Sequence, residues 1–231
     1  MQAALSSAGE PCRKGLLALG DSITVGEGSM ALGITPLSWA QWLAKALDLA
    51  YTAYAFDGAT SADVLREQLP RVRFQYDVAT LYAGVNDVRA ASFDVAAYER
   101  DLDAVARGLA ARSTRLLMVT MPEDLGRPSS APKPVAANEA VRRVAERHGA
   151  LVADLADFGG WTHVQPDVVH PTPLGQVEIA DRAARALGCA MMPSELVRDR
   201  RGHDVRYAPA HARAVARNLA RRARERVIPP R

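Results

Sequence analysis

Short apolar segments alternate with amphipathic segments along most of this 231-residue chain. The apolar segments have the length and composition of buried strands, and they cover residues 16–19, 49–56, 77–82, 116–120 and 151–155. The amphipathic segments have the period of helices, and they cover residues 35–47, 61–69, 94–112, 135–148 and 173–187. Strands and helices that alternate in this way form βαβ units and parallel sheets. We therefore expect an α/β fold, a three-layer α/β/α sandwich around a five-stranded parallel sheet.

Several predicted helix ends carry their own boundary signals. Thr35 and Pro36 are typical of the N-cap and first position of a helix, and Pro173 is typical of the start of the last one. Gly149 suits the position after a helix C-terminus. Four prolines in residues 121–134 predict a loop there.

The positive charge of the chain is concentrated at its C-terminal end. The formal net charge is +3, but residues 191–231 carry 11 arginines and four acidic residues, which leaves residues 1–190 net acidic. We therefore expect a core domain at 1–190 and an Arg-rich extension at 191–231, mainly helical, with an amphipathic helix at 209–228. This helix would pack on the domain or on a second copy of the chain, giving a homo-oligomer. Its alanine-rich apolar face argues against membrane binding, and nucleic acid is an unfavoured partner because no reading motif accompanies the charge.

Compartment signals are weak. No run of 18 apolar residues occurs, and residues 1–12 lack the basic and apolar regions of a secretory signal, so we expect a cytoplasmic protein, or a secreted one if a signal was already removed. Cys12 and Cys189 are the two cysteines, and free thiols are the default in the cytosol. Export would favour a disulfide, because the last core helix should end near the start of the first strand.

Reactive residue types follow the predicted strands. The segments are Gly20-Asp21-Ser22, Asp57-Gly58, Gly84-Val85-Asn86-Asp87 and, before the last helix, Asp167-Val168-Val169-His170. Sites in open parallel sheets form at the carboxyl ends of the strands, so these segments should meet at one edge.

Three of these residues suit nucleophilic catalysis. A serine such as Ser22 becomes reactive when an imidazole takes its proton, and a carboxylate orients that imidazole. Asp167 and His170 are three positions apart, so one tight turn can join the carboxylate to Nδ1 while Nε2 faces Ser22. The Ser22 and Gly58 N–H groups and the Asn86 amide could bind the resulting oxyanion.

In this order, the four segments resemble the blocks of the SGNH, or GDSL-type, hydrolase family, over roughly residues 15–188. The resemblance implies a flavodoxin-like sandwich with Ser22 as nucleophile, His170 as general acid and base, and Asp167 as its partner. It also implies an oxyanion hole made of Ser22, Gly58 and Asn86, and it calls for no cofactor and no metal.

Other polar residues have simpler structural interpretations. We expect Asp21 and Asp87 to cap helices or close turns, and Gly20 and Gly84 to allow unusual backbone conformations. His163 could form a metal site with Asp167, but a solvent-facing position or one on the pocket rim is the favoured interpretation because no third ligand is evident.

The sequence therefore predicts a serine esterase that cleaves small-molecule carboxylic esters of short or medium acyl chains through an acyl-enzyme. Carbohydrate O-deacetylase, thioesterase, lysophospholipase and acyltransferase activities remain open on the same site. So does a non-catalytic binding protein that acts through its basic extension.

Overall fold

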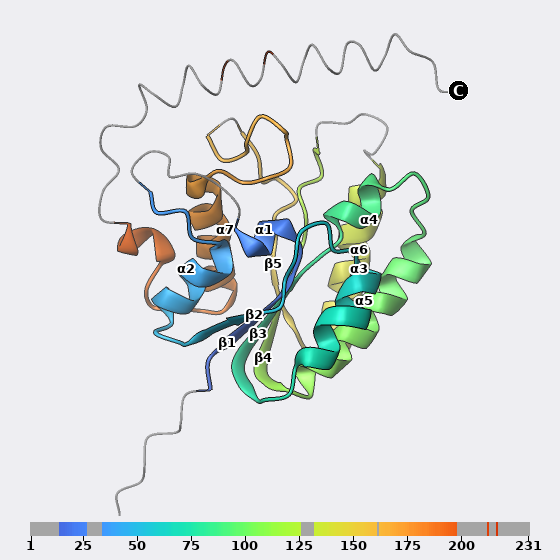
Figure 1. Ribbon diagram of the computed structural model, residues 1–231, viewed down its shortest axis with the longest axis horizontal. Coiled ribbons are helices and arrows are strands. Elements are labelled where there is room, and N and C mark those ends of the chain that lie inside the picture. The colour runs from blue at the N-terminus through green and yellow to red at the C-terminus, as the bar shows by residue number, and fades with distance from the viewer. Residues whose placement is uncertain are drawn as a thin grey trace, which may run out of the picture.

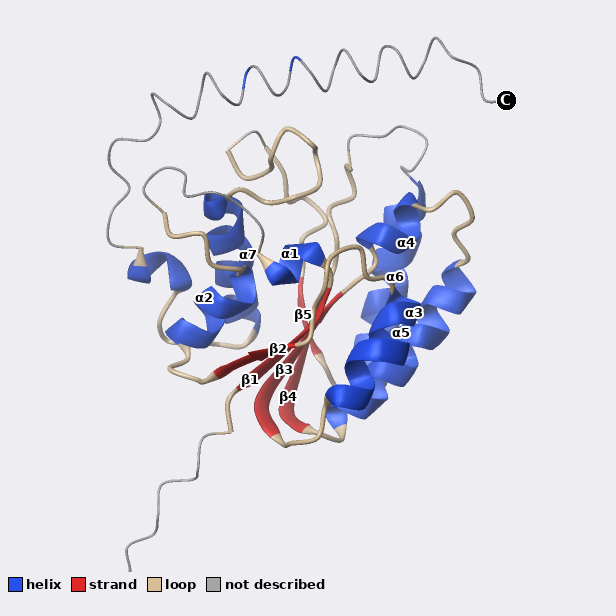
Figure 2. Ribbon diagram, viewed as in Figure 1, coloured by secondary structure: helices blue, strands red, loops and turns tan. Residues whose placement is uncertain are grey.

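A five-stranded parallel sheet forms the centre of the molecule (Figure 2). The computed structural model describes residues 14–26, 34–125, 132–160 and 162–197, and also residues 212 and 216. The strands are β1 (Leu16–Gly20), β2 (Tyr51–Ala53), β3 (Tyr76–Tyr82), β4 (Ser113–Val119) and β5 (Leu151–Ala153). Their spatial order is β2-β1-β3-β4-β5, with every pair parallel, which is the flavodoxin-like order. The predicted fold class is confirmed.

Helices cover both faces of the sheet (Figure 1). On one side α2 (Trp39–Ala46) packs against α7 (Pro173–Ala186), next to the short α1 (Ser22–Val25) that follows β1. On the other side α5 (Val95–Ala110) packs against α6 (Pro132–Arg147), with α3 (Ser61–Asp63) in contact with α5 and α4 (Val85–Arg89) in contact with α6. Two helical layers around one sheet make the three-layer sandwich.

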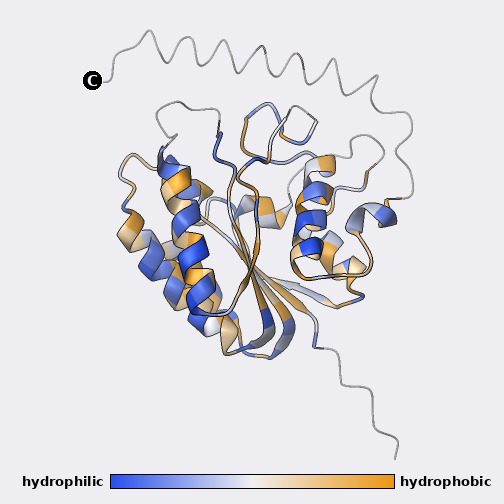
Figure 3. Cartoon of the chain, turned by 180° about the vertical axis from the view of Figure 1, so that it is seen from behind, coloured by the Kyte–Doolittle hydropathy of each residue, from blue (hydrophilic) through white to orange (hydrophobic). Residues whose placement is uncertain are grey.

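The core lies between these layers. Every residue of β1 is buried, because a parallel sheet covered on both faces has no side that meets water. Trp39 of α2 packs edge-on against Tyr82 of β3, with ring centroids 6.2 Å apart. Figure 3 shows hydrophobic and hydrophilic residues alternating along the helices, as amphipathic packing on a sheet requires.

The predicted start of the helix at residues 35–47, which corresponds to α2, is wrong. Thr35 and Pro36 precede the helix, which begins at Trp39 with Ser38 as its N-cap. The Ser38 hydroxyl accepts from the Gln41 N–H, and the Gln41 side chain accepts from the Ser38 N–H. This reciprocal capping box satisfies two backbone N–H donors at the start of the helix.

The other predicted elements exist with shifted ends. The segment predicted as a helix at 61–69 is a short α-helix, a π-helical turn at Val64–Gln68 and a 3-10 turn at Leu69–Arg71. The predicted loop 121–134 is too long, because α6 begins at Pro132. Strands β2 and β5 are shorter than predicted and β4 begins earlier. Gly149 follows α6 with a φ of 61°, as predicted.

Part of the predicted extension packs on the core. A 3-10 turn at Pro193–Leu196 contacts α2 and α7, and the Ser194 N–H donates to Asp181 at 2.8 Å. Apart from residues 212 and 216, the predicted helix 209–228 lies outside the described residues, and so does Cys12. The predicted oligomer, domain boundary and disulfide therefore stay predictions. No helix within the described ranges is long and apolar enough to span a bilayer.

Candidate active site

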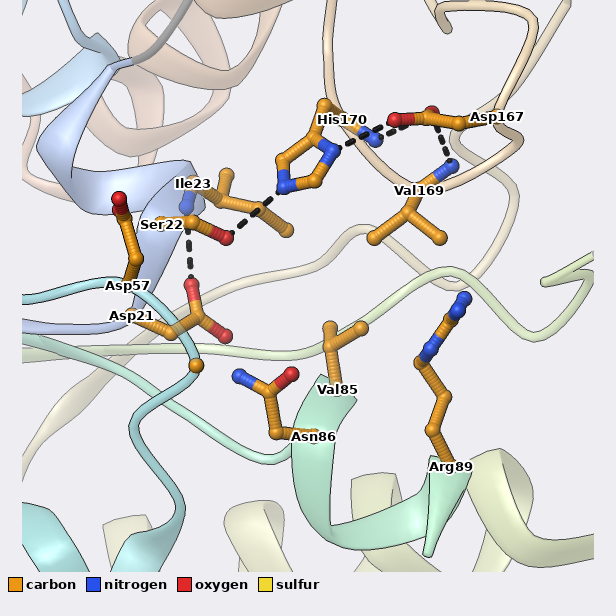
Figure 4. Close-up of a pocket in the computed structure, with 11 residues that line it drawn as sticks. Asp21, Ser22, Ile23, Asp57, Val85, Asn86, Arg89, Asp167, Val169 and His170 are labelled. Atoms are coloured by element: carbon orange, nitrogen blue, oxygen red, sulfur yellow. Dashed lines mark hydrogen bonds and ion pairs between the residues drawn. The ribbon is translucent and has the colours of Figure 1, made fainter.

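Four of the segments that follow strands meet around one pocket at the carboxyl edge of the sheet (Figure 4). The pocket has a volume of about 350 Å³ and is open to solvent on one side. Its walls are Asp21, Ser22, Ile23, Asp57, Gly58, Val85, Asn86, Arg89, Asp167, Val169 and His170. The structure thus brings together all five residues that the sequence predicted for the site.

The turn that carries Ser22 is tightly enclosed. A Cβ atom at position 20 would collide with the backbone carbonyl oxygen of Tyr82, so Gly20 is required by close approach of two strands. Asp21 is the N-cap of α1, and its Oδ1 accepts from the Ile23 N–H at 3.0 Å, as expected for a capping aspartate. Ser22 is therefore the first helical residue, and its N–H lacks an intrahelical acceptor.

Two buried amide side chains hold this turn from opposite sides. Gln68 accepts from the Gly20 N–H at 2.9 Å and donates to the Gly20 carbonyl at 2.8 Å. Gln176 of α7 donates to the Ile23 carbonyl at 3.1 Å and accepts from the Trp39 N–H at 2.8 Å. Both are almost fully buried, so Ser22 lies between two fixed points of the backbone.

The acid–base pair lies in the loop before α7. His170 Nε2 is 2.9 Å from Ser22 Oγ, and His170 Nδ1 is 2.6 Å from Asp167 Oδ2. Asp167 Oδ1 accepts from the Val169 and His170 N–H groups at 2.9 and 3.0 Å. The two ring nitrogens thus face the two groups that the spacing of Asp167 and His170 predicted.

The charge on Asp167 is favoured by these contacts. Burial acts to raise the pKa of this carboxyl, but hydrogen bonds from the His170 ring and from two backbone N–H groups outweigh it and lower the pKa. An ionised Asp167 keeps the imidazole proton on Nδ1, which leaves Nε2 able to accept the serine proton.

The three residues predicted for the oxyanion hole, Ser22, Gly58 and Asn86, all line the pocket. Gly58 has a φ of 76°, and no heavy atom would lie within 4 Å of a Cβ there, so its backbone is accessible. Asn86 donates one amide hydrogen to the Ala59 carbonyl at 3.0 Å, which leaves the second available. With the Ser22 N–H, these groups are suited to bind developing negative charge.

Sequence reasoning missed the environment of Asp21. Its side chain is 1% exposed, and burial raises its pKa from 3.8 to about 7, against the opposing effects of the Ile23 N–H and His170. It also missed the clamping role of Gln68 and Gln176, because isolated glutamines carry no motif. Arg89 was missed as well, although its position three residues after Asn86 places it one helical turn further along α4.

His163, which the sequence analysis considered as a metal ligand, does not line the pocket. Its Nδ1 lies 3.3 Å from Thr162 Oγ1, and its ring packs on Phe158 at 6.1 Å. Among the described residues, no group of three or more His, Cys, Asp or Glu side chains is arranged to hold a metal ion.

The fold and this chain of contacts define a hydrolase class: a Ser–His–Asp arrangement at the carboxyl edge of a flavodoxin-like sheet. Residues 18–177 match the family model of the GDSL-like lipase/acylhydrolase family. The chain belongs to this family and is a hydrolase that acts on ester bonds.

Solved structures with this fold include several hydrolases. The chain is similar to LAE5, an α/β hydrolase from the metagenome of Lake Arreo, Spain, with 23% identity, a TM-score of 0.62, and coverage of 75% of this chain and 94% of that one. It is also similar to Axe2, an acetylxylan esterase from Geobacillus stearothermophilus, with 18% identity, a TM-score of 0.60, and coverage of 75% and 93%. TesA matches with 21% identity, a TM-score of 0.59, and coverage of 74% and 97%. Curated proteins gave no match.

Proposed function

We propose that the protein hydrolyses esters of short acyl chains with polar alcohols, and that Ser22, His170 and Asp167 carry the reaction. The observation that supports this most directly is the continuous chain of contacts from Ser22 Oγ through His170 to Asp167, at 2.9 and 2.6 Å. The similar enzyme Axe2 has catalytic mutants in which a serine and an aspartate are replaced.

The reaction proceeds through an acyl-enzyme. Ser22 Oγ attacks the ester carbonyl while His170 Nε2 takes its proton, and the tetrahedral oxyanion is bound by the Ser22 and Gly58 N–H groups and the Asn86 amide. His170 then gives the proton to the leaving alcohol as the carbon–oxygen bond breaks. A water molecule then attacks the acyl-enzyme while His170 takes its proton. The bond between the acyl carbon and Ser22 Oγ breaks, His170 returns the proton to Oγ, and the acid is released.

The pocket supports the choice of substrate. Its volume of about 350 Å³ is at the lower end of the range of ligand pockets, which suits a short acyl group. Asp57 and Arg89 lie at opposite sides of it (Figure 4), where they can bind hydroxyl groups of the alcohol. An acetylated carbohydrate meets both requirements, and Axe2 is an acetylxylan esterase.

The test is a comparison of p-nitrophenyl acetate, butyrate and octanoate, together with acetate release from acetylated xylooligosaccharides. We expect kcat/KM to fall from acetate to octanoate, and Ser22→Ala to lower kcat by at least about 10⁴-fold. Ser113→Ala is the matched control, because Ser113 lies at the opposite edge of the sheet, at the start of β4. Unchanged turnover in Ser22→Ala would exclude the catalytic assignment, and an octanoate rate equal to the acetate rate would exclude the chain-length preference.

A further inference from the structure

The carboxyl group of Asp21 is buried beside the nucleophile and only half satisfied. Oδ1 accepts from the Ile23 N–H, whereas Oδ2 is buried and has no hydrogen-bond partner within the part of the chain that the structure describes. A helix cap needs only one of these oxygens. The second is thus unexplained by the structural role that the sequence predicted.

Asp87 is a second carboxyl group near the site, and it is half-buried. Its two oxygens accept from the Ser61 N–H at 3.1 and 3.2 Å and from the Ser61 hydroxyl at 2.6 Å. Burial raises the pKa of Asp87, and these hydrogen bonds from a neighbouring helix start offset part of that effect. Asp21 has no comparable compensation, and burying an uncompensated carboxylate is costly.

The imidazole of His170 lies between two carboxyl groups. Its Nδ1 faces Asp167, and its Nε2 faces Ser22, the residue that follows Asp21 in the chain (Figure 4). Asp21 and His170 line the same pocket, and His170 acts electrostatically on Asp21. A cation on this ring is therefore attracted from both sides.

We propose that Asp21 is a positioning residue of the active site: its buried carboxylate provides a second negative charge that stabilises the His170 imidazolium while Ser22 attacks. This inference rests on the proposed function. The charge develops on His170 only as the serine proton is transferred, so the attraction is stronger in the transition state than in the resting enzyme. Because the Asp21 carboxyl is buried, water screens this attraction less than it would between two exposed groups.

Other charged groups around Asp21 leave this assignment intact. The titratable groups that face it are Tyr82 of β3, Asp87 of α4, Tyr98 of α5 and His170, and the pocket wall adds Asp57, Arg89 and Asp167. Burial raises the pKa of Tyr82 and of Tyr98 well above the usual value, so both phenols stay neutral. Asp57 is exposed and Arg89 is half-buried, so water screens their charges.

The test removes the charge at position 21 and keeps a side chain there that can cap α1. Asp21→Asn and Asp21→Ser both retain a good N-cap, so α1 can still form. The proton uptake of the His170 ring is followed by NMR between pH 4 and 9, alongside the pH profile of kcat/KM. We expect both midpoints to move to lower pH by about one unit and the plateau kcat to fall by up to about tenfold.

Asp57→Asn is the matched control for charge. It removes one carboxylate from the same pocket, but Asp57 is exposed, and we expect its effect on the His170 midpoint to be clearly smaller. Equal midpoints in wild type and both Asp21 variants would overturn the proposal. An equal shift in Asp57→Asn would also overturn it, because the effect would then come from general pocket charge.

A second readout reports whether Asp21 ionises in the folded protein. Its pKa of about 7 in the folded state lies above the ordinary carboxyl value of 3.8, so the folded protein binds the proton more tightly than the unfolded chain. The folded state therefore loses stability as pH rises from about 4 to 7, and Asp21→Asn removes this loss. We expect the melting temperature of Asp21→Asn, relative to wild type, to increase across this range, and a constant difference would show that Asp21 carries no titrating charge.

These readouts separate the two proposals. If no ester is hydrolysed by any variant, the proposed function fails, while the NMR midpoint of His170 still reports whether Asp21 acts on the ring. If esters are hydrolysed and the midpoint does not move, only the role of Asp21 fails.

Discussion

The two halves of the active site are held in opposite ways. The Ser22 turn is enclosed in the core and held by Gln68 and Gln176, which are 48 and 153 positions from the backbone groups that they bind at Gly20 and Ile23. The Asp167–His170 loop is half exposed and held mainly by its own hydrogen bonds, over two or three positions. The nucleophile thus depends on long-range packing, whereas the acid–base pair depends on a local turn.

Because of this difference, we expect substitutions in the two halves to affect stability and activity differently. A change in the local loop removes chemistry and leaves the buried framework intact, because few core contacts are lost. A change at the clamps of the Ser22 turn leaves buried backbone groups without partners, and it alters folding and catalysis together. Three substitutions and one control substitution test the contrast.

Asp167→Asn has the largest expected effect. The amide can still contact His170 but favours the wrong tautomer, and we expect kcat to fall by about 10⁴-fold. The melting temperature should change by only a few degrees, because the Asp167 side chain is 42% exposed. Steady-state kinetics and calorimetry on the same preparation check both values, and a large loss of stability would contradict the local character of this loop.

Gln68→Leu has the second-largest expected effect on activity. It leaves the Gly20 N–H and carbonyl buried without partners, so we expect the free energy of unfolding to fall by about 2–4 kcal/mol. A displaced Ser22 should also lower kcat by about 10- to 100-fold at nearly constant KM. Urea unfolding and kinetics measure these changes.

Asn138→Leu is the control for Gln68→Leu. The Asn138 amide binds both backbone groups of Met121 in the same way, at 2.8 and 2.9 Å, on a segment that does not line the pocket. We expect a comparable loss of stability with normal kcat per folded molecule. Equal losses of kcat in both variants would show that the Ser22 turn is not held in a special way.

Val168→Asn has the smallest expected effect. Val168 adopts a φ of 64°, which is unfavourable for a β-branched residue and better tolerated by asparagine. Relief of this strain should raise the free energy of unfolding by about 1 kcal/mol and the melting temperature by a few degrees. A lower melting temperature in calorimetry would show that contacts of the valine side chain outweigh the strain.

The same contrast explains what the sequence could predict. The layers and the Ser22, Asn86, Asp167 and His170 positions follow from patterns that are local or that recur at strand ends, whereas the flavodoxin-like strand order was implied by the family resemblance. The clamps could not be predicted, because nothing near Gln68 or Gln176 indicates a partner so distant in the chain. The start of α2 was misplaced for a local reason, since the Ser38 and Gln41 capping signal lies only three residues after Thr35.

The contact between α7 and the Ser22 turn has a consequence for biosynthesis. Gln176 binds the Ile23 carbonyl across 153 positions, so a nascent chain on the ribosome carries its serine long before the residue that completes the turn. Contacts of such high order form late in folding. We therefore expect ester cleavage to begin only when nearly the whole sandwich has emerged from the ribosome and folded. Incomplete chains should not cleave esters.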